Sequence, residues 1–145
     1  MFLKASWQNT IAEKGISVYN AIMAEYLDTK EGLSFLDGDK ELYKMLLDAY
    51  ANESKFDPNA LKDFIKKKEF EAAAKIVHKT KGASYQIGAA KLGCQAQALE
   101  DILRSKVQPD ASQRSPEEMA ALAQDFCDAY QKCLEEAEAA ASELQ

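Results

Sequence analysis

The three- and four-residue spacing of apolar side chains constrains the fold of this chain more than any other feature. This spacing recurs along most of the 145 residues, and no stretch shows the strict alternation expected of a half-buried strand. Short polar loops separate the periodic segments, and such loops favour antiparallel neighbours. The sequence therefore predicts an all-α bundle of five to seven helices. The five best-defined helices are expected at about 39–54, 57–65, 69–87, 88–105 and 115–143.

Two further helices are expected before these, at 3–13 and 17–27. The second would place Val18, Ile22 and Tyr26 or Leu27 on one face. Residues 1–31 carry no distinctive motif, so we expect them to add one or two packed helices to the bundle.

Local signals mark where several of these helices begin. Asp57 followed by Pro58 is typical of an N-cap and a first helical residue. In "SPEE", Ser115 is the expected N-cap, Pro116 the first helical residue, and Glu118 the partner in a capping box. The last helix would be roughly 40 Å long at about 1.5 Å per residue. Its acidic, alanine-rich end is therefore expected to project past the bundle.

The periodicity also predicts which side chains face the core. Leu61, Phe64 and Ile65 should point inward from the second of the five helices, and Leu92, Leu99 and Ile102 from the fourth. In the first of the five helices the inward set is larger and comprises Leu42, Met45, Leu46, Ala49 and Tyr50. In the last helix it comprises Met119, Leu122, Phe126, Tyr130, Cys133 or Leu134, and Ala137.

Cysteine usage and hydropathy place the chain among soluble intracellular proteins. Cys94, Cys127 and Cys133 are odd in number and form no CxxC pair, so buried free thiols are expected. No apolar run approaches the roughly 20 residues of a membrane span. The N-terminus also lacks the apolar core of a signal peptide. We expect a cytoplasmic protein.

Charge is distributed unevenly along the chain. The net charge is −6, yet residues 62–91 hold eight lysines against three acidic residues, giving +5, while the remainder carries −11. A basic zone on an acidic protein favours an acidic or phosphorylated partner. Nucleic acid is disfavoured because the zone has no arginine and few aromatic residues. A solvated lysine face is the alternative interpretation.

The only histidine, His78, lies within this basic zone. Helical spacing predicts a buried stripe on one face and a separate face that carries His78. Gly82, one turn later, should lower the stability of the helix by about 1 kcal/mol relative to alanine. Close approach of another macromolecule would explain why a glycine stands at this position. Lys79 and Lys81 flank this surface. The predicted stripe is Ile76, Val77, Thr80, Ala83 or Ser84, and Ile87, and the other face holds Ala74, His78, Gly82 and Tyr85.

The stretch "VHKTKGASYQIGAAKLGCQAQALE" resembles the signature of histidine-containing phosphotransfer (HPt) domains. In that family the histidine is followed by lysine at +3, glycine at +4, a small residue at +5, glycine at +10, an aliphatic residue at +14 and a Leu-Glu or aliphatic-Gln pair at +21 and +22. Thr80 departs from the usual leucine at +2. The matching residues here are His78, Lys81, Gly82, Ala83, Gly88, Leu92, Leu99 and Glu100.

The resemblance implies an antiparallel four-helix bundle of HPt type. It divides the chain into an N-terminal helical extension (1–31), a core with the phosphoacceptor helix (32–105) and a C-terminal bundle helix (115–143). We expect a single domain and a monomer.

The resemblance also implies a reaction. His78 would take a phosphoryl group from the phospho-aspartate of a response-regulator receiver domain and pass it to another receiver. Glu100 would hydrogen-bond the imidazole, and Lys81 would neutralise the phosphoryl oxygens. The chain itself is expected to bind no metal or other cofactor, because the receiver supplies Mg²⁺. The expected docking residues are Ala74, Lys79, Gly82, Tyr85 and Gln86.

Other functions stay open at this point. The chain could be the phosphoacceptor domain of a chemotaxis-type histidine kinase, a bundle that binds receivers without accepting phosphate, or a scaffold in which His78 is incidental. "GAAKLGC" lacks the lysine and Ser/Thr of a phosphate-binding P-loop. The protein is therefore expected to carry phosphate without making it from ATP.

Overall fold

The computed structural model describes residues 24–53 and 56–144, and within them the chain is helical, without strands. The all-α prediction is confirmed. The predicted helix 3–13 and most of 17–27 lie outside the described residues, while residues 24–27 are not helical. The elements are α3 (Thr29–Ser34), α4 (Lys40–Glu53), α5 (Pro58–Lys66), α6 (Phe70–Gln86), α7 (Ala90–Leu103), a 3-10 turn η1 (Ala111–Gln113) and α8 (Pro116–Glu143).

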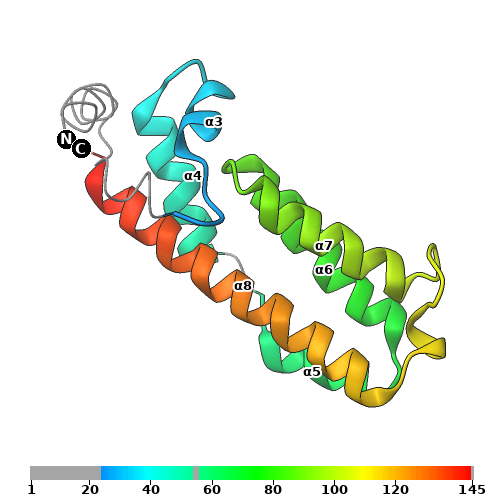
Figure 1. The fold of residues 1–145 in the computed structure, drawn as a ribbon. Coiled ribbons are helices and arrows are strands. Elements are labelled where there is room, and N and C mark those ends of the chain that lie inside the picture. The colour runs from blue at the N-terminus through cyan, green and yellow to red at the C-terminus, as the bar shows by residue number, and fades with distance from the viewer. Residues whose placement is uncertain (1–23, 54–55, 145) are drawn as a thin grey trace, which may run out of the picture.

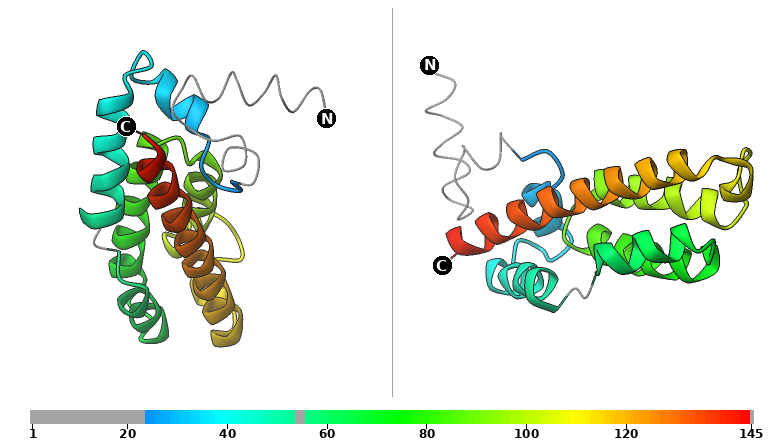
Figure 2. Two further views of the ribbon diagram at one scale, coloured as in Figure 1. Left: turned by 90° about the vertical axis from the view of Figure 1, so that its left-hand side faces the viewer. Right: turned by 90° about the horizontal axis from the view of Figure 1, so that it is seen from below.

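Helix α8 runs along the whole bundle and organises the other helices (Figure 1). α4 packs against its C-terminal half and α5 against its N-terminal half, so these two shorter helices together occupy one position of the bundle. α6 and α7 form a long antiparallel pair that supplies two more positions, as the two further views also show (Figure 2). The result is a four-position helical bundle.

The predicted caps form where the sequence places them. The Asp57 side chain accepts hydrogen bonds from the backbone N–H groups of the first turn of α5, and Pro58 follows it. The Ser115 side chain accepts from the Glu118 backbone N–H, with Pro116 at the first helical position, so the N-cap forms as half of the predicted capping box, without the reciprocal bond from the Glu118 side chain. These side chains satisfy amide groups that have no partner within the helix.

The turn between α6 and α7 is built around Gly88. Its backbone has φ +87°, a left-handed conformation that favours glycine. The N–H of Gly88 donates to Tyr85 O and that of Ala89 donates to Ser84 O, which together form a Schellman motif. Gly88 therefore closes α6. The prediction that it opens α7 was wrong, because its positive φ is incompatible with a helical position.

Helix α4 buries only part of the face that was predicted. Leu42 and Met45 are 40% and 66% exposed, so their assignment to the core was wrong. Tyr50 is buried as predicted, and Tyr43 and Leu47 are buried at positions that the prediction did not include. The Tyr43 hydroxyl donates to Ile87 O at 2.8 Å, so the ring is buried and its hydroxyl still has a hydrogen-bond partner.

Most other core predictions hold. Leu61, Ile65, Leu92, Leu99, Met119 and Phe126 are buried. Thr80, which replaces an aliphatic residue of the HPt pattern, is also buried, and its hydroxyl donates to Ile76 O at 3.1 Å. An internal helix bond of this kind allows a hydroxyl to stand at an apolar position.

The C-terminal end of α8 does not project past the bundle. Ala137, Ala140, Ala141 and Leu144, in the last turns of the helix and just after it, are buried. The Glu136 carboxylate fastens the segment before α3 by accepting hydrogen bonds from the backbone N–H groups of residues 25–27. A run of alanines is therefore a packing surface here and not a free helix.

The cysteines are free, and two of the three are buried as expected. Cys127 and Cys133 lie in the core on α8, but Cys94 is exposed on α7, so its predicted burial was wrong. Among the described helices, none is both long and apolar enough to cross a membrane.

The Gly88 turn should be sensitive to substitution. A Cβ at this position would lie 2.4 Å from Asp28 O and 2.8 Å from Gly32 N, both backbone atoms. We expect Gly88→Ala to lower the free energy of unfolding by about 3 kcal/mol, combining left-handed backbone cost with a clash. Denaturant unfolding followed by circular dichroism measures this loss.

Gly38→Ala is the matched control for this prediction. Gly38 also has a positive φ, +79°, but apart from its chain neighbours no atom of the described residues lies within 4 Å of a Cβ built there. The free energy of unfolding of Gly38→Ala should fall only by the cost of the left-handed backbone, about 1 kcal/mol. Equal losses for the two variants would contradict the packing role given to Gly88.

Candidate functional site

His78 stands on the outer surface of α6. Its side chain is 60% exposed, whereas Val77 and Thr80 on the same helix are buried in the bundle. The prediction that this histidine faces solvent is therefore matched by its position. Two turns of helix separate it from the α6–α7 turn.

The antiparallel pairing of α6 and α7 brings Glu100 to the imidazole. The Nδ1 atom of His78 lies 3.0 Å from Oε2 and 3.2 Å from Oε1 of Glu100. The two residues are equally far along the chain from Ala89, the N-cap of α7. Lys81 contacts Gln97, and Tyr85 contacts Gly93. In each of these pairs, too, the two residues are equally far along the chain from Ala89. One hairpin register therefore sets all of these pairs.

Glu100 is a buried carboxylate, and its surroundings keep it ionised. Its side chain is 7% exposed. Burial raises the pKa of Glu100, but the hydrogen bonds and charges of Lys81 and His78 lower it more, so its pKa lies below the ordinary value of 4.5. The site therefore contains a buried negative charge on α7, next to the exposed imidazole.

Two cations balance this charge. Lys81 Nζ donates to Glu100 Oε1 at 2.9 Å and to Gln97 Oε1 at 2.8 Å. On the other side, Arg104 Nε lies 3.1 Å from Glu100 Oε2. This Nε is buried and not aligned as a hydrogen-bond donor, so the contact is an ion pair. The guanidinium also donates to Glu71 at 3.2 Å.

Gln97 and Arg104 were missed by the sequence reasoning, although a signal for them existed. They lie three residues before and four residues after Glu100, which places all three on one face of α7. A search of the helical neighbours of Glu100 would have found both.

The ionised carboxylate fixes the tautomer of the imidazole. A carboxylate can only accept hydrogen bonds, so the proton of a neutral His78 ring sits on Nδ1. The lone pair is then on Nε2, the nitrogen that does not contact Glu100. The carboxylate holds the ring by the same contact that orients the histidine of a catalytic triad.

The surface around His78 has room for another macromolecule. Gly82 is exposed, and apart from the backbone of its own helix and its chain neighbours no atom of the described residues lies within 4 Å of a Cβ built there, so packing does not require glycine. Lys79 and Gln86 are exposed as well. Tyr85 is 41% exposed and lies across Gly93 of α7, with its hydroxyl 3.6 Å from Cys94 Sγ.

Ala74 does not belong to this surface. It is completely buried, which contradicts its prediction as a docking residue. α6 contacts both α5 and α7, so its buried arc is wider than the single stripe that periodicity defines. The residue one turn before His78 falls inside that arc.

No metal site accompanies the histidine. In residues 24–53 and 56–144, no three or more His, Cys, Asp and Glu side chains are grouped so that they could hold a metal ion. Glu100, the one carboxylate beside His78, is already engaged by Lys81 and Arg104.

Comparison with known proteins identifies the family. The family model described as the Hpt domain matches residues 45–140 of the chain. The chain belongs to the Hpt domain family. No curated protein and no solved structure matches it.

Membership assigns the protein to phosphorelay signalling of two-component systems, in which Hpt domains interact with receiver domains and kinases. The match begins within α4 and ends near the end of α8, so it includes the α6–α7 pair and His78. The finer division of the chain at residues 31, 105 and 115 stays a prediction.

The charge on Glu100 should appear in the pH dependence of stability. Because its folded pKa is depressed, its ionisation stabilises the folded state fully above about pH 4.5, and this contribution is lost as the pH falls through the folded pKa. Glu100→Gln lacks the contribution. We expect wild type to lose more free energy of unfolding than Glu100→Gln when the pH is lowered from 6 to 3, as measured by urea unfolding. A difference independent of pH would contradict the ion-pair network.

Gly82 should matter for partner binding and not for folding. We expect Gly82→Gln to weaken binding of a receiver domain about tenfold, equivalent to about 1.4 kcal/mol, because the new side chain occupies the space beside His78. Titration calorimetry measures the affinity. Ala121→Gln adds the same side chain at an exposed position on α8 and should leave the affinity unchanged. Unchanged affinity in Gly82→Gln would refute close approach as the reason for the glycine.

Proposed function

We propose that the protein is a phosphorelay intermediate that accepts a phosphoryl group on His78 from a phospho-aspartyl receiver domain and passes it to a second receiver. The observation that carries the proposal is the exposed imidazole whose Nδ1 is held by the buried, ionised Glu100. Both features serve a nucleophile, whereas an incidental surface histidine requires neither.

In the proposed step, the Nε2 lone pair attacks the phosphorus of the aspartyl phosphate. The N–P bond forms while the bond between phosphorus and the aspartate oxygen breaks, and the aspartate leaves as a carboxylate. The ring becomes cationic as it gains the phosphoryl group. Glu100 stabilises that charge through the Nδ1–H hydrogen bond, so no proton needs to move.

The balance of charge around Glu100 supports this step. A carboxylate alone beside His78 would repel the incoming phosphoryl oxygens. Lys81 and Arg104 pair with Glu100 and offset its charge, while Arg104 also pairs with Glu71, so the carboxylate beside the ring is neutralised. Lys81 Nζ has three N–H donors and uses two of them within the chain, which leaves one for a phosphoryl oxygen.

The proposal includes a division of labour between the partners. Phosphoryl transfer depends mostly on alignment and neutralisation of charge. This chain would supply the oriented nucleophile and the lysine, and the receiver would supply the Mg²⁺. We also propose that the protein acts in the cytoplasm, as a monomer, and does not phosphorylate itself with ATP.

His78→Gln should abolish transfer. The experiment mixes the protein with a radiolabelled, phosphorylated receiver and follows label on this chain that survives alkali but not acid, as expected for phosphohistidine. Wild type should acquire the label and His78→Gln should not. Because the residue is exposed, the circular dichroism spectrum of the variant should stay that of wild type, which shows that the helices remain folded.

Two further results would redirect the proposal. Label on the His78→Gln variant would refute the assignment of the phosphoacceptor. If no receiver labels wild type but a histidine kinase with ATP does, the chain is the phosphoacceptor of a kinase, not a relay between receivers.

A further inference from the structure

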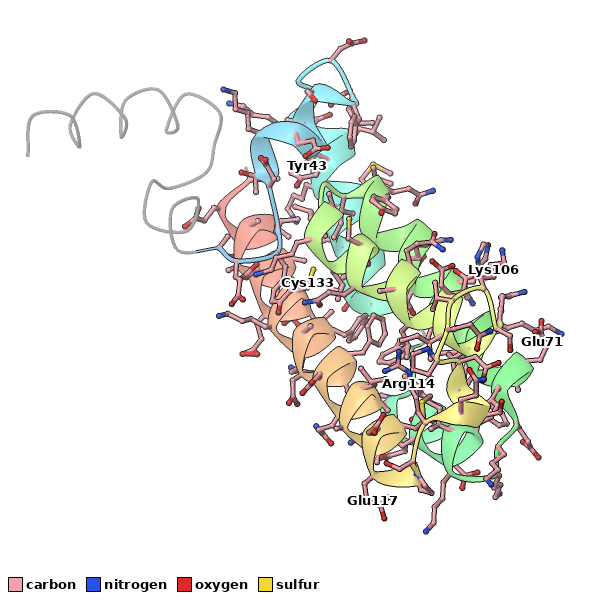
Figure 3. The ribbon with its side chains drawn as sticks, turned by 45° about the vertical axis from the view of Figure 1, so that its right-hand side comes forward. Tyr43, Glu71, Lys106, Arg114, Glu117 and Cys133 are labelled. Carbon is pink, nitrogen blue, oxygen red and sulfur yellow. The ribbon has the colours of Figure 1, made fainter. Side chains whose placement is uncertain are left out.

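A cavity lies at the end of the bundle opposite α3. Its volume is about 520 Å³, and it lies between α5, the start of α6, η1 and the N-terminal half of α8. Arg114 and Glu117, which line it, are seen at this end of the molecule in Figure 3. None of its lining residues belongs to the His78 network, and its volume falls within the range of small-molecule sites.

The inner wall of the cavity is apolar and continuous with the core. Ile65, Ala111, Met119 and Ala123 line it and are also buried members of the hydrophobic core, and the partly buried Phe70 adds an aromatic ring. A ligand with a hydrocarbon or aromatic body would remove this surface from water, which is favourable by about 25 cal/mol per Å².

The mouth of the cavity carries the opposite chemistry. Lys62, Lys66, Lys68 and Arg114 line it, against the single carboxylate of Glu117. The ion pairs of the described part of the chain include none of these four cations, and Arg114 Nε donates to Pro109 O at 2.9 Å. On a protein with a net charge of −6, a mouth with an excess of three positive charges is a distinct electrostatic feature.

Lys68 adds an independent observation. It occupies the left-handed position that ends α5, with φ +60°. Its N–H donates to Ile65 O and the next N–H donates to Phe64 O, so this is the place in a Schellman motif where glycine is normal. A non-glycine residue there costs about 1–2 kcal/mol. The chain accepts this cost and thereby adds a cation at the cavity mouth.

From these features we propose that the cavity binds a small amphipathic organic anion, with an alkyl or aromatic body against the apolar wall and a carboxylate or sulfonate at the lysines. Inorganic phosphate would leave the apolar wall unfilled, and a neutral hydrocarbon would leave the three lysines without a counter-charge. Only a ligand with both parts matches the wall and the mouth together.

The test uses the full chain with two probes, 8-anilinonaphthalene-1-sulfonate and dodecanoate below its micelle-forming concentration. We expect saturable fluorescence enhancement at one site per chain and displacement of the dye by dodecanoate. The double variant Lys66→Glu, Lys68→Glu should weaken dodecanoate binding at least about tenfold. Ala120→Trp, at an exposed position lining the cavity, should abolish binding by filling it while keeping the wild-type circular dichroism spectrum.

Lys67→Glu is the matched control. Lys67 lies between the two tested lysines, but it pairs with Asp63 at 2.9 Å and does not line the cavity. It should change the affinity by no more than about twofold. Absence of saturable binding, or equal affinity in wild type and Ala120→Trp, would overturn the proposal. Binding to anionic lipid vesicles without binding to free dodecanoate would also overturn it.

Discussion

The fixed register of the α6–α7 hairpin is the constraint on which the rest of the site depends. Gly88 closes α6 in a left-handed conformation, and the backbone of Asp28 and Gly32 packs directly against it, so the turn has little freedom to shift. Every pair across the hairpin then follows from its distance to that turn. A slip of one residue would separate His78 from Glu100 and leave the carboxylate buried without its imidazole.

Burial of Glu100 is what gives the site its chemical definition. A buried carboxylate is costly unless it is paired, and here Lys81 and Arg104 pair with it from two sides. The same pairing keeps the carboxylate ionised, which makes it an acceptor and directs the imidazole proton to Nδ1. Stability, tautomer and surface charge are therefore set by one side chain. Arg104, which does not contact the ring, acts on it only through Glu100.

Much of the fold and part of the site could be predicted from residues alone. Periodicity and capping signals placed the helices from α4 to α8 close to their observed bounds, because those signals act within a few turns of chain. The exposure of His78 followed from its place opposite Val77 and Thr80. The pairing with Glu100 came from the HPt resemblance. Periodicity failed at Leu42, Met45 and Ala74, where the number and position of neighbouring helices decide which arc is buried.

The sequence by itself determined that the chain is helical, where its helices begin, and that one histidine with an unhindered glycine beside it stands on a basic surface. These properties depend on local spacing and charge. Only the tertiary structure decided that Gln97 and Arg104 join the histidine site, that Ala74 leaves it, and that an apolar cavity with a cationic mouth forms at the far end. Such features require side chains from different helices to meet, and the spacing within one helix carries no information about its neighbours.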